Sequence, residues 1–354
     1  MPAPLTLDAA LTRGRHNNLD AIRLGAASAV VVSHAWPLAL GRGATEPLEA
    51  ALGLSLGGVA VLVFFFLSGL LITASAVRNA ARPARFVAAR VLRLFPGLAV
   101  ALAVTVAMAK ASGADAGLGE AAAYVLHGLS LVSLQHEISG AFAANPYPGA
   151  VNGPLWTLFY EVACYALIAG AVWLGLLRRA AGWAVAAALM AALLLLESGI
   201  GAALGGAMAH RLHVATPLML AFFAGALFWR LRGRVVLNWA GGVAAVALAV
   251  ATHGSALFLP AFIAALGYAA CLLAFGLPVL KLKGDISYGV YVYGWPVAQL
   301  IVAFAGPMTP ATLATLNLFA VLPFAAASWA FVEKPALGLL SRRRPAARAA
   351  ALAN

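Results

Sequence analysis

Residues 57–73 read GGVAVLVFFFLSGLLIT, an apolar run without a charged side chain. A bilayer-spanning α-helix needs about 20 such residues, so this stretch predicts a transmembrane helix. Comparable windows lie near residues 20–41, 55–77, 90–109, 154–177, 180–197, 212–230, 235–252, 257–277, 285–305 and 311–332. The sequence therefore predicts an all-α, polytopic integral membrane protein with about ten transmembrane helices.

The overall composition indicates the same class. Of the 354 residues, 64% are hydrophobic and 10% are charged, and the mean hydropathy is +0.95. Soluble domains usually contain about 45–50% apolar and about 25% charged residues, and a membrane β-barrel would alternate polar and apolar residues. The two cysteines, Cys164 and Cys271, lie in apolar windows. We therefore expect buried thiols, with neither a disulfide framework nor metal ligands.

The basic residues predict how the helices are oriented. If segment 120–135 does not span the membrane, all but three of the 23 Lys and Arg residues fall on the side of the N-terminus. The three exceptions are Arg42, Lys110 and Arg211. The positive-inside rule predicts such a bias, so we expect both termini to be cytoplasmic. The net charge of +12 is then a topology signal, and no nucleic-acid partner is expected.

The windows form one predicted transmembrane domain over residues 19–336. A polar segment, residues 1–18, precedes it, and a basic tail, residues 337–354, follows it near anionic lipid. Residues 111–153 are expected to form a long external loop with a re-entrant or surface-lying helix, followed by the turn-rich NPYPG at 145–149.

Three ionisable residues mark the first window: Asp20, Arg23 and His34. Asp20 and Arg23 share a helix face. His34 lies eleven residues after Arg23, which is three turns plus about 20°, so both point the same way. Ionisable residues inside membrane helices are usually functional. The simpler alternatives are a snorkelling anchor for Arg23, a helix cap for Asp20 and an interhelical hydrogen bond for His34.

Arg90 and Arg93 form a pair at the expected cytoplasmic start of the third helix. Two guanidinium groups on one helix face suit phosphates, through forked hydrogen bonds. Topology marking is the alternative, although nearby arginines already supply enough charge for it.

Other polar residues occur inside or beside apolar windows. Glu161 lies about one turn into the outer half of the fourth window, where a carboxylate is costly unless it faces a polar cavity. The alternative is an interfacial residue beside Trp156. Ser68 belongs to a small-residue pair that allows close helix approach. Asp285 and Ser287 are expected to cap the ninth helix.

These segments together resemble the membrane acyltransferase-3 family, whose members O-acylate bacterial surface glycans. The resemblance covers about residues 18–336 and rests on LDAIRLGAASAVVVSH (19–34), GGVAVLVFFFLSGLLIT (57–73), FVAARVLRLFP (86–96), LWTLFYE (155–161), ISYGVYVYGWPV (286–297) and VEKP (332–335). In the family, a basic residue and a histidine separated by ten residues are followed by paired arginines and then by a glutamate. Here these are Arg23 and His34, Arg90 and Arg93, and Glu161. Gly294 stands where many relatives have histidine.

The resemblance implies a ten-helix O-acyltransferase without a permanently bound cofactor or metal. Its co-substrate would be cytoplasmic acyl-CoA, with acetyl-CoA expected, and its acceptor a hydroxyl of a glycan or a lipid-linked saccharide. The implied location is the bacterial cytoplasmic (inner) membrane. His34 would act as a general base or carry the acyl group transiently as an acyl-imidazole, and both alternatives stay open.

The resemblance also implies roles for the other residues. Arg90 and Arg93, with Arg23, would hold the phosphates of the donor, and Asp20 would orient Arg23. Glu161 would bind or orient the acceptor from the outer side. Supporting residues are expected to be Ser68, Trp156 and Tyr288. The alternative function is a transporter or flippase of a glycan or lipid precursor, because proton-coupled carriers also place Arg, His and Glu inside the membrane.

Overall fold

The computed structural model describes residues 5–14, 16–132, 135, 137–196 and 206–340 of the chain. Helices make up 76% of the structure. The described residues contain two isolated β-bridges and no strand. The prediction of an all-α fold is therefore confirmed, whereas most of the predicted basic tail, from residue 341 onward, lies outside the described residues.

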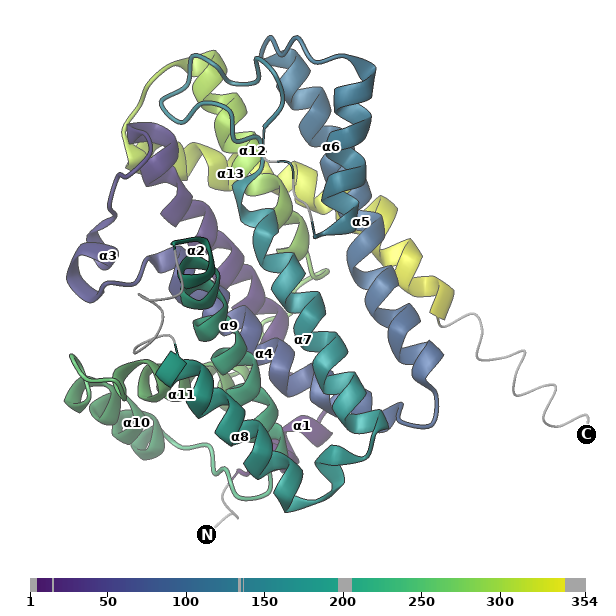
Figure 1. Cartoon of the computed structure of the whole chain (residues 1–354), viewed down its shortest axis with the longest axis vertical. Helices are drawn as coiled ribbons and strands as arrows, with labels where there is room; N and C mark the ends of the chain where they lie inside the picture. Colours follow the sequence, from purple (N-terminus) through teal and green to yellow (C-terminus); the bar gives the residue numbers. More distant parts are fainter. Residues whose placement is uncertain (1–4, 15, 133–134, 136, 197–205, 341–354) are drawn as a thin grey trace, which may run out of the picture. The chain divides into compact units, whose positions relative to one another are not determined.

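The helices follow one another along the chain as drawn in Figure 1. Their bounds are α1 Leu7–Thr12, α2 Leu19–Leu40, α3 Pro47–Leu52, α4 Leu56–Arg78, α5 Pro83–Ala111, α6 Leu118–Ser130, η1 Gly153–Leu155, α7 Trp156–Trp173, η2 Leu176–Arg178, α8 Ala180–Leu195, α9 Gly206–Arg230, α10 Trp239–Ala251, α11 Phe258–Gly276, α12 Ser287–Ala305, α13 Pro310–Ser328 and η5 Trp329–Glu333. Segments η1 and η2 are 3₁₀ turns, and η5 is a π-helix.

All ten predicted windows coincide with helices, and seven helices in the described chain are long and apolar enough to cross a membrane. These seven span Leu56–Arg78, Pro83–Ala111, Gly153–Trp173, Ala209–Arg230, Phe258–Gly276, Ser287–Ala305 and Pro310–Leu340. Helix α2 has 22 residues, among them Asp20, Arg23 and His34, and it is not one of these seven. Helices α8 and α10 are apolar but have only 16 and 13 residues. The count of ten spans and the cytoplasmic position of the termini stay predictions.

Helix α5 begins earlier than the sequence predicts. It starts at Pro83, a residue type favoured in the first turn because it has no N–H to leave unbonded. Arg90 and Arg93 therefore lie about two to three turns into the helix and not at its start.

One compact unit consists of residues 1–23, 61–83 and 160–282. In this unit α4 and α9 approach one another closely through glycines. A side chain at Gly69 would meet the carbonyl oxygen of Phe222 at 1.9 Å, and one at Gly225 would meet that of Phe66 at 2.0 Å. The predicted close approach at the Ser68–Gly69 pair is thus confirmed. Both cysteines of the chain are also buried in this unit, as expected.

The other compact unit consists of residues 24–60, 84–159 and 283–354. Its most buried helix is α12, which packs against α13. A Cβ atom at Gly289 would lie 2.6 Å from the Cα of Ala325, so the backbones of the two helices pack closely at this point. Farther along, the amide of Asn317 donates to the carbonyl of Gly294 over 2.8 Å.

The segment between α5 and η1 contains α6, which confirms the helix predicted there, while its external location stays a prediction. The loop that follows α6 is hydrogen-bonded to α12. Asn145 Nδ2 donates to the carbonyl of Gln299 over 2.9 Å, and Gln299 Nε2 donates to the carbonyl of Ala150 over 2.9 Å. Asn152 Nδ2 donates to the carbonyl of Val292 over 2.9 Å. These buried amides hold the loop against one face of α12.

Candidate functional site

The predicted site residues belong to both compact units. The unit with α9 and α11 contains Asp20, Arg23, Ser68 and Glu161. The unit with α12 contains His34, Arg90, Arg93, Trp156 and Tyr288.

His34 on α2 packs against an aromatic side chain of α12. Its ring meets that of Trp295 edge to face, with the centroids 5.0 Å apart and the planes at 75°. Trp295 is 6% exposed, and its Nε1 donates to the carbonyl of Ala150 over 2.9 Å. The ring of Tyr147 also meets Trp295, at 5.3 Å. Trp295 is therefore held from two sides and supports one side of the imidazole.

Gly294, the position at which the resemblance predicted a histidine, has a packing role here. A Cβ atom at this position would lie 2.7 Å from Cγ2 of Val31 on α2. The absent side chain lets α2 and α12 approach one another at the level of His34. The sequence singled out position 294 but did not reveal this packing or the neighbouring Trp295.

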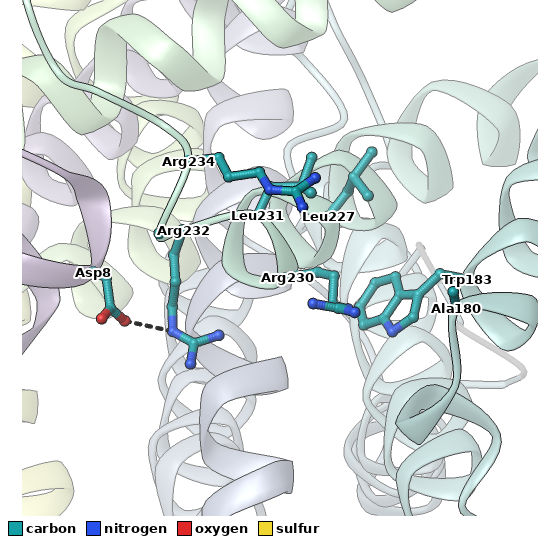
Figure 2. Close-up of a pocket in the computed structure, with 9 residues that line it drawn as sticks. Asp8, Ala180, Trp183, Leu227, Arg230, Leu231, Arg232 and Arg234 are labelled. Carbon is teal, nitrogen blue, oxygen red and sulfur yellow. Dashed lines mark hydrogen bonds and ion pairs between the residues drawn. The ribbon is translucent and has the colours of Figure 1, made fainter.

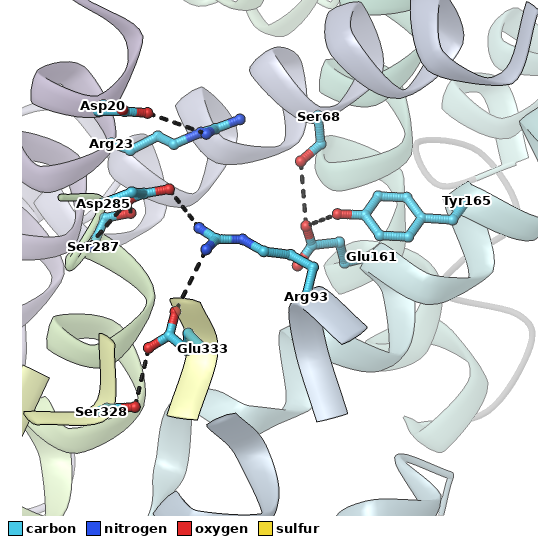
Figure 3. A network of polar contacts seen from close by, with 10 residues as sticks. All are labelled: Asp20, Arg23, Ser68, Arg93, Glu161, Tyr165, Asp285, Ser287, Ser328 and Glu333. Carbon is cyan, nitrogen blue, oxygen red and sulfur yellow. Dashed lines mark hydrogen bonds and ion pairs between the residues drawn. The ribbon is translucent and has the colours of Figure 1, made fainter. Parts of the chain in front are cut away.

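Arg93 on α5 lies between two carboxylates of the same unit, as Figure 3 shows. Its Nη2 is 2.5 Å from Oδ2 of Asp285, and its Nη1 is 3.4 Å from Oε2 of Glu333. Ser287 Oγ donates to Asp285 over 2.5 Å, and Ser328 Oγ donates to Glu333 over 3.0 Å. The cluster thus joins α5, the start of α12 and the π-helix η5.

Burial explains why these charges are matched. The side chain of Glu333 is fully buried and that of Asp285 is 10% exposed. A carboxylate in such surroundings is tolerated only when a cation and hydrogen-bond donors compensate it. Asp285 also accepts from the backbone N–H of Ser287, the first residue of α12, over 3.3 Å. The N-cap of α12 is Ile286, which has no side-chain cap hydrogen bond, so the prediction that Asp285 and Ser287 occupy the cap is wrong. The sequence did not identify Glu333, although VEKP belonged to the resemblance.

Arg90 lies one turn before Arg93 on α5, and Tyr288 on α12 contacts the same helix. The guanidinium of Arg90 lies over the ring of Phe86, 5.9 Å from its centroid. The hydroxyl of Tyr288 donates to the carbonyl of Leu94 over 3.0 Å and links α12 to α5. Tyr288 therefore supports the helix that carries both predicted phosphate-binding arginines.

Glu161 on α7 is half-buried and hydrogen-bonded within its unit (Figure 3). Its Oε1 accepts from the hydroxyl of Ser68 over 3.2 Å and from the hydroxyl of Tyr165. The structure thus brings Ser68 and Glu161 together, which the sequence did not predict. A carboxylate held on one oxygen by two hydroxyl groups has a fixed orientation and spare acceptor capacity.

The remaining predicted residues have simpler surroundings. Arg23 Nη1 is 3.7 Å from Oδ1 of Asp20, so the predicted ion pair within α2 is present. Trp156, the first residue of α7, is 38% exposed.

The comparisons with known proteins point to one family. A family model described as an acyltransferase domain matches residues 16–332. Nodulation protein 10 of Rhizobium leguminosarum bv. viciae is 29% identical over 92% of this chain and 94% of its own length. An O-acetyl transferase of Shigella phage Sf6 is 28% identical over 90% of this chain and 96% of its own length.

A third relative is the exopolysaccharide production protein ExoZ of Rhizobium meliloti (strain 1021). It is 29% identical over 80% of this chain and 90% of its own length. No solved structure matches the chain.

Proposed function

Because the chain belongs to the acyltransferase-3 family, we propose that it transfers an acyl group, with acetyl expected, from cytoplasmic acyl-CoA to a hydroxyl of a cell-surface or exported glycan. The observation that carries this proposal is the family match over residues 16–332, which includes every helix from α2 to α13. The names of two relatives, an O-acetyl transferase and an exopolysaccharide production protein, support a hydroxyl acceptor on a glycan.

The proposed reaction forms a C–O bond and breaks the C–S bond of the thioester. With His34 as general base, the imidazole takes the proton of the acceptor hydroxyl as its oxygen attacks the acyl carbon, and the proton then passes to the departing thiolate. With His34 as carrier, an imidazole nitrogen first displaces the thiolate, which takes up the proton that the acylated ring loses. The acceptor oxygen then displaces the imidazole, and the hydroxyl proton returns to the ring. Both routes give the same products, an ester and free CoA.

The surroundings of His34 support a reactive role. A group that must meet a reacting atom in a defined geometry contributes more when its ring cannot reorient freely. The edge-to-face contact with Trp295 restricts the imidazole in this way, and the hydrogen bond from Trp295 to Ala150 fixes the indole.

The donor phosphates are proposed to contact Arg90, and Arg23 keeps its predicted role because it shares α2 with His34. Arg93 already contacts Asp285 and Glu333, so a phosphate would compete with those carboxylates for its guanidinium. This arrangement supports a positioning role in addition to the predicted phosphate contact: Arg93 fixes the part of α5 that carries Arg90.

Glu161 is proposed to bind or orient the acceptor. Replacing it with glutamine keeps an oxygen for Ser68 and Tyr165 to donate to but removes the negative charge. We expect Glu161→Gln to raise the acceptor concentration needed for half-maximal rate by about tenfold, the loss of one charge-assisted hydrogen bond, with unchanged saturation by acyl-CoA. Tyr165→Phe is the comparison variant: it leaves the charge in place and removes one of the two hydroxyl groups that orient it, so its effect should be smaller. Equal acceptor saturation in Glu161→Gln and the native chain would contradict the role.

The whole proposal is tested with membranes that contain the chain and labelled acetyl-CoA. We expect label to enter the glycan fraction as an ester that mild base releases, and only when the chain is present. A chain that changes glycan export without transferring label would instead support the transporter or flippase alternative. Label that appears equally in membranes without the chain would overturn the proposal.

A further inference from the structure

A pocket of about 460 Å³ lies at the C-terminal end of α9, within the unit of residues 1–23, 61–83 and 160–282. Figure 2 shows it, with the Asp8–Arg232 pair on one side and Trp183 on the other. Its lining includes Asp8, Trp183, Leu227, Arg230, Arg232 and Arg234. The proposed acyl transfer uses none of these residues.

The walls of the pocket are held by backbone contacts. The N–H of Leu7 on α1 donates to the carbonyl of Val235 over 2.8 Å, and the N–H of Asp8 donates to that of Arg232 over 3.0 Å. On the other wall, Trp183 of α8 is 7% exposed and its Nε1 donates to the carbonyl of Leu177 over 3.0 Å. The pocket is therefore built from fixed segments on both sides.

Arg232 is part of that frame. Its Nε donates to Oδ1 of Asp8 over 2.6 Å, and its Nη1 donates to the carbonyl of Trp229 over 3.0 Å. Its guanidinium also lies 4.5 Å from the ring centroid of Trp229. These contacts neutralise Asp8, so the carboxylate does not oppose an anion entering the pocket.

Arg230 and Arg234 differ from Arg232. Both are exposed, and neither forms an ion pair with a carboxylate in the part of the chain that the structure describes. With Arg232 matched by Asp8, the pocket keeps the charge of two guanidinium groups. Guanidinium forks suit phosphate oxygens, and an electropositive pocket that also contains apolar side chains suits a ligand with an apolar part.

We propose that this pocket binds a phosphate group, with Arg230 and Arg234 as donors and the Asp8–Arg232 pair as a fixed wall. The position of the pocket favours the head group of an anionic phospholipid. It lies at the end of a helix that is apolar enough to span the membrane, and Trp183 and Leu227 adjoin the arginines. On the predicted topology this end of α9 is cytoplasmic, where anionic lipids attract basic residues. A soluble phosphate is the other source of the same chemistry.

The test uses the purified full chain in a neutral detergent, titrated with phosphatidylglycerol, phosphatidylcholine or inorganic phosphate. Retained lipid is counted by native mass spectrometry, and the thermal midpoint is followed in parallel. We expect phosphatidylglycerol to be retained and to raise the midpoint more than phosphatidylcholine does. Arg230→Gln/Arg234→Gln should weaken phosphatidylglycerol binding roughly 25-fold, at about 1 kcal/mol for each arginine.

Two further variants make the test specific. Arg13→Gln/Arg82→Gln removes the same charge from exposed positions of the same unit outside the pocket and should bind phosphatidylglycerol like the native chain. Asp8→Asn removes the negative charge that neutralises Arg232 and should tighten binding several-fold. This variant tests the proposal even if the double pocket variant fails to fold.

The outcomes separate the two sources of phosphate. Retention of phosphatidylglycerol that inorganic phosphate does not displace supports a lipid site, and displacement with a raised midpoint in phosphate alone supports a soluble ligand. The proposal is overturned if phosphatidylglycerol and phosphatidylcholine act alike and phosphate has no effect. An equal loss of binding in Arg13→Gln/Arg82→Gln, or no gain in Asp8→Asn, would also overturn it.

Discussion

Replacing His34 with alanine is expected to lower the rate of acyl transfer by at least about 100-fold, the usual lower limit for the loss of a general base. If the imidazole carries the acyl group, transfer stops altogether, because the covalent route no longer exists. The measurement is the initial rate at which label moves from acetyl-CoA to the glycan fraction, at equal amounts of membrane-inserted protein.

The same assay distinguishes the base from the carrier. If the acyl group passes through the imidazole, rapid quenching in cold detergent near neutral pH should trap label on the native chain and none on His34→Ala, because acid would hydrolyse an acyl-imidazole. His127→Ala is the matched control, because it removes an exposed imidazole on α6 and should leave the rate unchanged. A His34→Ala variant that retains the native rate would exclude both roles for His34.

Replacing Arg93 with alanine is expected to destabilise the fold by about 3–5 kcal/mol, the usual cost of leaving buried carboxylates without their cation. Asp285 and Glu333 would both lose their guanidinium partner, and hydroxyl groups alone do not compensate two negative charges. The free energy of unfolding in detergent, or the thermal midpoint without ligand, measures this change.

Two further variants separate the positioning role of Arg93 from donor binding. Arg93→Ala/Glu333→Gln removes one of the stranded charges and should recover part of the lost stability. Arg90→Ala should leave stability close to native but weaken the protection that acyl-CoA gives against thermal unfolding. An Arg93→Ala variant as stable as the native chain would show that the carboxylates do not depend on this cation.

Much of the fold follows from the sequence because the requirement for a membrane helix is local. A sufficiently long run of apolar residues can be recognised in the sequence alone, and every predicted window coincides with a helix. Helix ends were less predictable, because α5 continues through its basic first turns from Pro83. Helix α2 shows the limit of recognising membrane helices by composition. The polar residues that make it a candidate for function, Asp20, Arg23 and His34, also lower its hydropathy.

The contacts of the candidate site depend on residues far apart in the chain. Arg93 pairs with Asp285 and Glu333, which are 192 and 240 residues away, so no local pattern reveals the pairing. The sequence contained only an indirect indication that Arg93 has another role: the nearby arginines already supply the charge that the positive-inside rule needs. Trp295 was equally hidden, because its contact with His34 depends on the packing of Gly294 against Val31.

Residues 137–152, before η1, bear on how the proposed acceptor would reach His34. Lifting residues 145–152 from α12 would break the hydrogen bonds of the amides of Asn145, Asn152 and Gln299, at about 0.5–1.5 kcal/mol for each bond. It would also release Trp295, whose indole is bonded to Ala150. These contacts fix residues 145–152 against α12, so on the proposed function we expect the acceptor to reach the imidazole without displacing them.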